Sequence, residues 1–168
     1  MRYDETCFHC GDHLLHTLSA EIAEVKAVID GVRWRRSFAF TNQGKTYEHQ
    51  TAYNKALQAG FSALGWETQP RLRSQPRLIG DFRKELVFVE VQFGNSASLY
   101  RDYYKFQYGL ANGLLSLAVL IVPVTPRSFF PTRPSSVTNM AEYALAATCL
   151  TVLPISVPTM LIGLLPAN

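Results

Sequence analysis

Cysteine and net charge are both scarce in this chain of 168 residues. Three cysteines are too few for a disulfide framework, which argues against a small disulfide-stapled secreted domain and favours a reducing cytoplasm. A formal net charge of +3 permits a polyanionic partner but does not require one. A Gly-rich phosphate loop, a serine nucleophile elbow and a Rossmann fingerprint are all missing from the sequence, so the enzyme classes built on them are not indicated.

Long apolar runs are also rare. The longest weakly charged stretch, residues 141–165, contains Glu142 and is interrupted by Pro154 and Pro158, which disfavours a transmembrane helix. The first 20 residues are polar and include three histidines, unlike a signal peptide. We therefore expect no membrane segment, and we interpret the apolar tail as a buried helix followed by buried strand.

The spacing of apolar residues predicts an α/β fold built as a single domain over residues 1–168. Apolar residues recur at helical intervals in the segments 14–29, 47–64, 99–109 and 138–147. Alternating or continuous apolar residues predict strands at 33–40, 77–82, 86–93, 114–124 and 160–165, and a short extended segment at 66–71. This order of elements indicates a mixed central sheet flanked by helices.

The residues with the clearest chemistry are Asp81 and, nine residues later, Glu90-Val91-Gln92. A short turn at 83–85 predicts a hairpin that brings Asp81 near Glu90, while Glu90 and Gln92 share one face of their strand. Two converging carboxylates repel each other unless a cation lies between them, and Mg²⁺ suits such oxygen ligands. On spacing alone, the solvated outer face of a hairpin explains the pattern equally well.

The surrounding residues carry a resemblance to a known family. The stretch IGDFRKELVFVEVQFGN, residues 79–95, is similar to the active-site hairpin of PD-(D/E)XK nucleases, in particular type II restriction endonucleases of the BglII/BstYI type. In that group a glutamine replaces the last lysine of the motif. The later segments RDYYKF, LAVLIVP and PTMLIGLLP are similar to the same group and come in the same order. The resemblance implies a restriction-endonuclease-like fold.

The resemblance also implies roles for individual residues. Asp81 and Glu90 would ligate Mg²⁺, for which Mn²⁺ can substitute, together with the carbonyl of Val91. Gln92 would lie near the nucleophilic water. Glu48, early in the second predicted helix, matches the place of an auxiliary catalytic acid in many of these nucleases. Alternatively, Glu48 is a carboxylate at a helix N-terminus, where the helix dipole favours it.

Residues that read DNA would follow the hairpin directly. The resemblance implies that Asn95 faces the major groove, where an asparagine can pair with adenine. Ser96 and Ser98 could assist. Arg133 and Ser136, in the loop before the last predicted helix, are further candidates, and an arginine suits guanine. Each of these residues also has a plainer interpretation as a helix cap or a solvated loop residue.

The N-terminal residues Cys7, Cys10, His13 and His16 are of the types that bind zinc. They all fall within ten residues of one another, whereas structural zinc sites draw ligand pairs from separate elements, so zinc is not favoured here. A polar segment that leads into the first helix is the alternative interpretation.

The sequence therefore predicts a Mg²⁺-dependent, site-specific endonuclease that hydrolyses phosphodiester bonds in double-stranded DNA, as a type II restriction endonuclease of a bacterial or archaeal cytoplasm. By analogy with the group it resembles, we expect a homodimer and a palindromic site centred on GATC, with a cognate DNA methyltransferase as a candidate partner. The apolar helix faces at 14–29 and 103–110 are candidates for the dimer surface. Two alternatives stay open: a repair or mobile-element DNA nuclease, and a catalytically decayed nuclease-fold protein that only binds DNA.

Overall fold

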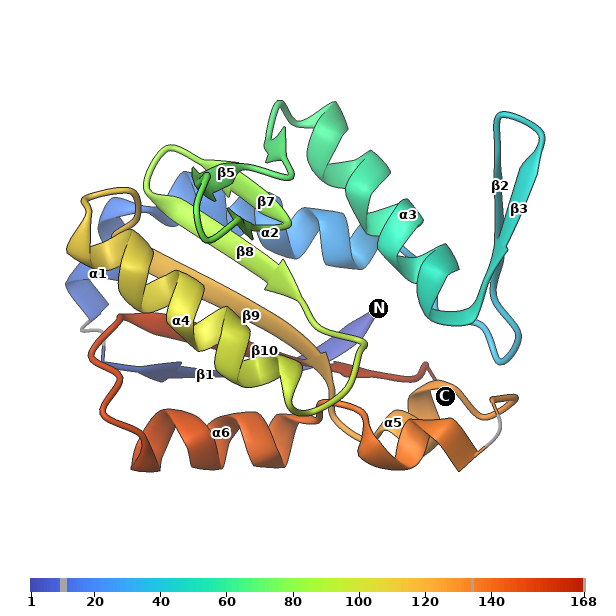
Figure 1. Cartoon of the computed structure of the whole chain (residues 1–168). Coiled ribbons are helices and arrows are strands. Elements are labelled where there is room, and N and C mark those ends of the chain that lie inside the picture. The colour runs from blue at the N-terminus through green and yellow to red at the C-terminus, as the bar shows by residue number, and fades with distance from the viewer. Residues whose placement is uncertain (10–11, 134, 168) are drawn as a thin grey trace.

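A six-stranded mixed sheet forms the centre of the protein (Figure 1). The computed structural model describes residues 1–9, 12–133 and 135–167, with the backbone alone at 12, 13, 135 and 136. The strand order is β1 (Arg2–Phe8), β10 (Thr159–Leu165), β9 (Leu117–Pro123), β8 (Val87–Val91), β7 (Phe82–Lys84) and β4 (Glu67–Thr68). Strands β8, β9 and β10 run parallel, and β1, β7 and β4 are each antiparallel to the neighbour nearer the centre. The predicted α/β class with a mixed sheet is therefore confirmed.

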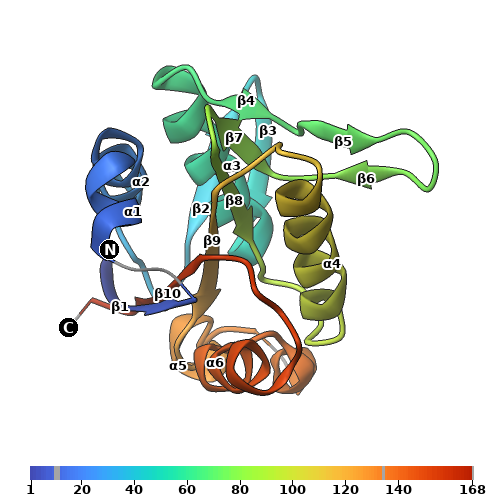
Figure 2. The same cartoon turned by 90° about the vertical axis from the view of Figure 1, so that its left-hand side faces the viewer.

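Helices cover both faces of this sheet (Figure 2). On one face, α2 (Ser19–Gly31) and α3 (His49–Ala63) pack in one core cluster with Val89 and Val119. On the other face, α4 (Ser98–Ala111) and α6 (Tyr143–Val152) pack with Phe88 and Leu120. Because both faces are covered, all seven residues of β9 are buried, as its continuous apolar sequence predicts.

Further hairpins and short helices lie outside the central sheet. Strands β2 (Ala39–Asn42) and β3 (Lys45–Glu48) form an exposed hairpin that projects beside the start of α3 (Figure 1). Strands β5 (Arg71–Arg73) and β6 (Leu78–Ile79) form another hairpin, which projects above α4 in Figure 2. The short helices are α1 (Asp12–Thr17), α5 (Pro126–Phe129) and a 3-10 helix (Ser135–Asn139).

The region before α3 differs from its prediction. Residues 33–38 do not form a strand, and pairing begins only at Ala39. The hydroxyl group of Tyr53 on α3 accepts a hydrogen bond from the backbone N–H of Arg35 at 3.0 Å, so tertiary contact with a helix replaces the expected ladder. Residues 47 and 48, which were predicted to be helical, instead belong to strand β3 and pair with β2. Leu64, predicted to point inward, is 39% exposed.

The single strand predicted at 77–82 is divided between two strands, β6 and β7, because the chain changes its pairing partner within this segment. Residues 78 and 79 pair with β5, and the chain then bends so that Phe82 begins the pairing with β8. The turn of the β7–β8 hairpin consequently falls at Glu85 and Leu86, one to two residues later than predicted, with Glu85 at a φ of 47°. The extended segment at 66–71 is divided between β4 and the start of β5.

Two differences concern the ends of the chain. The last helix begins at Tyr143 rather than at 138, because a 3-10 turn precedes it and Met140 forms an isolated bridge with Asn95. Strand β1 was not predicted at all. Most of its residues are exposed at the edge of the sheet, so they carry no apolar alternation from which a strand could be read.

The helix faces proposed for dimerisation are used within the chain. Val25 and Ile29 of α2 are fully buried in one core cluster, and Tyr103 and Phe106 of α4 are buried in the other. The prediction that these faces supply the dimer surface was therefore wrong. A search of the described residues finds no helix that is long and apolar enough to cross a membrane.

Candidate active site

The β7–β8 hairpin brings two carboxyl groups together at the end of the sheet. Phe82 pairs with Val89, so one further step along the same register sets Asp81 opposite Glu90. Oδ2 of Asp81 accepts a hydrogen bond from the backbone N–H of Val91 at 2.8 Å. Asp81 thus lies beside Glu90, as the short turn between the strands predicts.

Gly80 allows the chain to approach β8 closely at this point. A Cβ atom on Gly80 would lie 2.0 Å from Cζ of Phe88 and 3.1 Å from Oε1 of Glu90. Any side chain here would collide with the buried ring of Phe88. A glycine directly before Asp81 is therefore a condition for the approach of the two carboxyl groups.

Glu90 belongs to a buried charged network that joins β8 to α4. Nζ of Lys105 donates to Oε2 of Glu90 at 2.8 Å and to Oδ1 of Asp102 at 2.9 Å. Glu90, Asp102 and Lys105 are only 3%, 0% and 5% exposed. Among the residues that the structure describes, Oε1 of Glu90 is a buried side-chain oxygen without a hydrogen-bond partner. The side chain of Asp81 lies within hydrogen-bonding reach of Glu90, so a ligand bound at this oxygen would contact both carboxyl groups.

Burial shifts the acidity of these groups. Desolvation raises the pKa of Glu90 well above its usual value, and the negative charge of Asp81 adds to this effect while Lys105 opposes it. Desolvation also raises the pKa of Asp81, against the hydrogen bond from Val91. Desolvation lowers the pKa of Lys105, but the charges of Glu90 and Asp102 outweigh it, so this pKa is raised overall. Two adjacent carboxyl groups with raised pKa values would both be stabilised by a bound cation.

The side-chain amide of Gln92 is held at both ends. Its Oε1 accepts from the backbone N–H of Gly94 at 2.9 Å, and its Nε2 donates to Oδ2 of Asp102 at 2.6 Å. Gln92 therefore lies on the same face as Glu90, as the alternation of strand residues predicts. It ties the end of β8 to α4.

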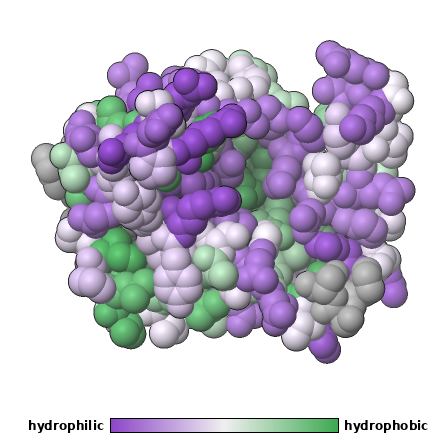
Figure 3. All heavy atoms as spheres, viewed as in Figure 1, coloured by the Kyte–Doolittle hydropathy of each residue, from purple (hydrophilic) through white to green (hydrophobic). Residues whose placement is uncertain are grey.

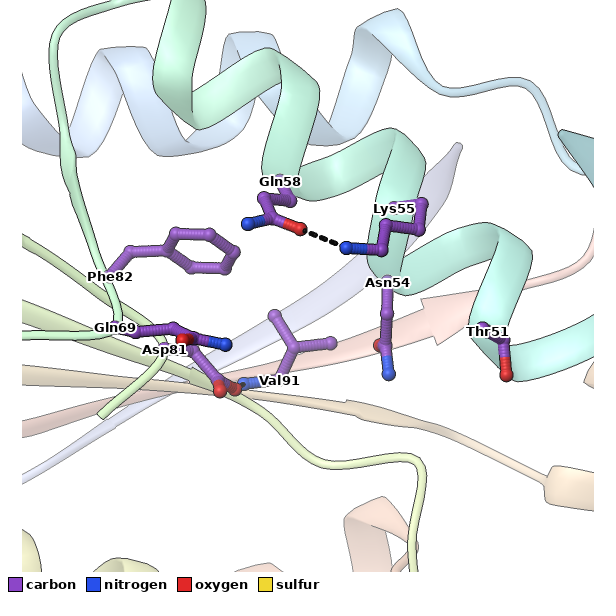
Figure 4. Close-up of a pocket in the computed structure, with 8 residues that line it drawn as sticks. All are labelled: Thr51, Asn54, Lys55, Gln58, Gln69, Asp81, Phe82 and Val91. Carbon is purple, nitrogen blue, oxygen red and sulfur yellow. Dashed lines mark hydrogen bonds between the residues drawn. The ribbon is translucent and has the colours of Figure 1, made fainter. Parts of the chain in front are cut away.

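A pocket of about 260 Å³ opens beside Asp81 on the α3 side of the hairpin. Asp81 and Val91 lie along one wall, and Lys55 and Gln58 of α3 face them from the other (Figure 4). Nζ of Lys55 donates to Oε1 of Gln58 at 3.0 Å. The face of the molecule in Figure 3 is hollowed between the protein body and the β2–β3 hairpin, and hydrophilic residues surround the hollow. The arrangement has room for a polar ligand beside the carboxyl group of Asp81.

A second pocket brings together residues that are distant in the sequence. Asn95, which follows β8, and Arg133, before the 3-10 helix, line it together with Gln50 of α3. Arg133 donates a hydrogen bond to Oε1 of Gln50. Oδ1 of Asn95 accepts from the backbone N–H of Ala97 at 2.8 Å, so its side chain has a fixed orientation. The structure therefore unites two of the residues that were predicted to bind DNA.

The other predicted site residues have less distinct surroundings. The backbone N–H of Ser96 donates to the carbonyl of Asn139 at 2.8 Å, and Ser98 is the first residue of α4. The side chain of Ser136 lies outside the described residues. Glu48 is exposed at the residue before α3, makes no side-chain cap and does not line either pocket. The roles of these residues stay predictions.

Sequence reasoning missed Asp102, Lys105 and Lys55. A signal for the first two was present, because both lie at helical spacing with the apolar residues Tyr103 and Phe106 on the buried side of α4. A charged residue on a buried helix face must find a polar partner in whatever it packs against. Lys55 is partly exposed and resembles an ordinary surface lysine, so no comparable signal points to it.

The structure describes only some of the N-terminal cysteines and histidines. Cys7 is exposed on β1 and His16 lies in α1, whereas Cys10 and the side chain of His13 fall outside the described residues. Within the described part of the chain, no group of three or more His, Cys, Asp or Glu is arranged to hold a metal ion.

Comparison with known proteins decides the family. The family model described as restriction endonuclease BglII/BglIII matches residues 3–164. The chain belongs to this family. Its enzyme class is accordingly that of the type II restriction endonucleases, which are site-specific DNA endonucleases. The resemblance that the hairpin motif carries is thereby confirmed.

Solved structures of BglII share the fold of this family member. The crystal structure of restriction endonuclease BglII complexed with a DNA 16-mer has a TM-score of 0.80 and 18% sequence identity, and the match covers 99% of this chain and 78% of that chain. The crystal structure of free BglII has a TM-score of 0.68 and 18% identity, with 99% and 81% covered. A search of curated protein sequences finds no match. The predicted restriction-endonuclease-like fold is confirmed.

Proposed function

We propose that this member of the BglII/BglIII family is a Mg²⁺-dependent endonuclease in which Asp81, Glu90 and the carbonyl of Val91 hold the metal ion. The observation that carries the proposal is the meeting of two desolvated carboxyl groups, one of which keeps its buried Oε1 unpartnered among the described residues. Mg²⁺ binds through one or two carboxylates together with phosphate oxygens of the substrate. When bound, it would polarise the phosphodiester and lower the pKa of an attacking water. Mn²⁺ also suits oxygen ligands and would substitute.

The neighbouring residues have supporting tasks in this proposal. Lys55 lies across the pocket from Asp81, where its ammonium group would attract a DNA phosphate. Gln92 holds the end of β8 through its bonds to Gly94 and Asp102, which keeps the Val91 carbonyl in place. For Glu48, an auxiliary acid role rests on the family resemblance alone.

We further propose that double-stranded DNA is the substrate and that the second pocket reads its bases. The BglII structure with the TM-score of 0.80 contains a DNA 16-mer, and this chain has the same fold. Asn95 and Arg133 line the pocket, and their amide and guanidinium groups suit adenine and guanine. Ser96, Ser98 and Ser136 follow these two residues within three positions in the sequence and could assist. By analogy with the group, the site would be palindromic and centred on GATC.

A palindromic site requires a two-fold symmetric enzyme when each chain holds one active site. We therefore propose a homodimer that acts in the cytoplasm of a bacterium or archaeon, accompanied by a DNA methyltransferase that modifies the same site. Tyr100 and Tyr104 on the outer face of α4 are 58% and 50% exposed, and they offer a contact surface in place of the buried helix faces. Sedimentation of the purified chain with and without DNA tests this point, and a monomer in both conditions would contradict it.

Digestion of unmethylated phage DNA tests the central proposal. The purified chain is incubated with the DNA in Mg²⁺, in Mn²⁺ and in EDTA. We expect discrete fragments with either metal and none with EDTA, and sequencing of the fragment ends would give the site and the cut position. A smear would instead favour a repair or mobile-element nuclease. No cleavage with any metal or form of DNA would favour the decayed, DNA-binding alternative.

Glu90→Ala separates catalysis from binding in the same assay. The substitution should lower cleavage by at least about 10²-fold, because it removes charge that acts at the reacting phosphate. DNA binding in EDTA should change little. Glu5→Ala is a matched control, since Glu5 is an exposed carboxylate on β1 that pairs with Lys26. Equal loss of binding and cleavage in Glu90→Ala would count against a catalytic role.

A further inference from the structure

Lys105 is a buried ammonium group in the segment RDYYKF, and sequence reasoning assigned it no individual role. It lies on the inner face of α4, 5% exposed, between two carboxylates that are themselves buried. Removing one ammonium and two carboxylates from water is unfavourable, and apolar residues of similar volume often stabilise a core equally well. Stability alone therefore does not account for a lysine at this place.

The contacts of Lys105 determine which carboxylate oxygen of Glu90 is left without a hydrogen-bond partner and can bind a metal ion. Its Nζ binds Oε2 of Glu90 at 2.8 Å, so the other oxygen, Oε1, is turned toward Gly80, where a Cβ atom would lie 3.1 Å away. Among the described residues this Oε1 has no hydrogen-bond partner. Lys105 thus holds one carboxylate oxygen and leaves the second one open.

The same ammonium group acts on Gln92 through Asp102. The two oxygens of Asp102 are divided between Nζ of Lys105 at 2.9 Å and Nε2 of Gln92 at 2.6 Å. Because Asp102 is fully buried, its carboxylate depends on Lys105 for charge balance. One lysine on α4 consequently orients both Glu90 on β8 and Gln92 just beyond the end of that strand.

We propose that Lys105 is a positioning residue of the hydrolytic site, which fixes Glu90 directly and Gln92 through Asp102. It provides from α4 the positive charge that a glutamine at position 92 cannot provide from the strand. When Asp81, Glu90 and Asp102 are ionised, Lys105 cancels one of three negative charges, and the remaining two match one divalent cation. This inference rests on the proposed nuclease function of the same residues.

Cleavage kinetics provide the first test. Lys105→Met removes the charge and keeps an unbranched side chain, and Asp102→Asn keeps the shape of the side chain while removing its charge. Lys26→Met is the matched control, because Lys26 forms a comparable 2.8 Å ion pair with Glu5, on β1. Single-turnover rates are measured with enzyme in excess over DNA and Mg²⁺ saturating, at a temperature where every variant is folded. DNA binding is measured in EDTA.

We expect Lys105→Met to cleave about 10- to 100-fold more slowly, the size of effect seen when a residue that orients a metal ligand is removed. Its DNA affinity should stay within about twofold of wild type, since Lys105 is buried and the loss concerns orientation at the reacting centre. Lys26→Met should cleave at the wild-type rate. If Lys105 only forms a core ion pair and positions nothing, folded Lys105→Met should cleave at the wild-type rate. That result would overturn the proposal.

The side-chain amide of Gln92 provides a second readout that does not require cleavage. Its ¹⁵N–¹H resonances are assigned by their absence in Gln92→Glu. In wild type they should show slow exchange with solvent, as expected of an N–H bonded to a buried carboxylate. They should shift in Lys105→Met and in Asp102→Asn but not in Lys26→Met. Unchanged Gln92 resonances in Lys105→Met would also overturn the proposal.

The two readouts separate the failure of this inference from the failure of the nuclease function. If wild type cleaves no DNA while the Gln92 resonances respond to Lys105→Met, the positioning contact stands and the proposed function falls. If wild type cleaves and Lys105→Met cleaves equally well, only the inference falls. Should Lys105→Met not fold, Asp102→Asn decides, and wild-type cleavage with unmoved Gln92 resonances in that variant would overturn it.

Discussion

Asp81 and Val91 are joined by one hydrogen bond, in which the backbone N–H of Val91 donates to Oδ2 of Asp81 at 2.8 Å. Asp81 lies directly before β7, and its backbone carbonyl accepts a hydrogen bond from the N–H of Gln69 at 2.8 Å, whereas its side chain is held by the bond to Val91. The bond sets the carboxyl group over the end of β8, where desolvation raises its pKa. An acid whose pKa is raised by folding is less stable ionised in the folded state than in the unfolded chain, so it lowers stability at neutral pH.

Asp81→Asn should therefore increase stability while it removes activity. The amide oxygen can still accept the N–H of Val91, and the cost of burying a negative charge disappears. We expect a higher free energy of unfolding at pH 7, and a cleavage rate lower by at least about 10²-fold because charge stabilisation worth several kcal/mol is lost. Thermal unfolding and cleavage assays on one preparation check both. Asp4→Asn, an exposed position on β1, should change neither, and a destabilised Asp81→Asn would contradict the argument.

Gly80→Ala tests the close approach of the chain to β8. The new Cβ atom would meet the ring of Phe88 at 2.0 Å, and Phe88 is fully buried, so the hairpin must shift. We expect a loss of about 1–3 kcal/mol in the free energy of unfolding, as for other overpacked sites, together with slower cleavage. Gly31→Ala is the control because nothing lies within 4 Å of its Cβ position. Equal denaturant midpoints for the two variants would contradict the steric argument.

Arg77 and Arg101 should contribute to DNA affinity through phosphate contacts. Both are exposed and line a hollow beside Lys105, at the edge of the candidate site. A lysine or arginine that neutralises one phosphate releases counterions, so Arg77→Ala should reduce the slope of log affinity against log salt by about 1. Fluorescence anisotropy over a salt series measures that slope. Arg2→Ala, on the far edge strand β1, should leave it unchanged, and parallel lines for wild type and Arg77→Ala would refute the phosphate contact.

Tyr53→Phe should loosen the segment that precedes the β2–β3 hairpin. The hydroxyl group of Tyr53 accepts from the backbone N–H of Arg35 at 3.0 Å and donates to its carbonyl at 3.3 Å. Losing these bonds should lower the free energy of unfolding by about 1 kcal/mol, measured by urea denaturation. Tyr108→Phe, on α4 and outside the proposed dimer surface, should be neutral. Faster hydrogen exchange at Arg35 in Tyr53→Phe alone would locate the effect, and unchanged exchange there would contradict it.

The local sequence pattern was enough to predict the strands at the centre of the sheet, which have a neighbouring strand on each side. The run at 114–124 is apolar except for Ser116, and residues 117–123 of it form the central strand β9, because only a strand covered on two faces buries every side chain. The alternation at 86–93 likewise predicted that Glu90 and Gln92 share a face, and both contact residues of α4. The edge strand β1 and the division of 77–82 between two hairpins were not predictable in this way, because their pairing depends on distant partners.

The sequence by itself determined the α/β class, which follows from periodicity, and it pointed to the family and to the two candidate carboxylates, Asp81 and Glu90, through a motif of residues close together in the chain. Only the tertiary structure decided what surrounds those carboxylates. Lys105 lies 15 residues from Glu90 in the chain, and Arg133 lies 83 residues from Gln50. No local pattern encodes such meetings, because they arise when helices dock on a completed sheet and a buried charge takes the partner that packing brings within reach.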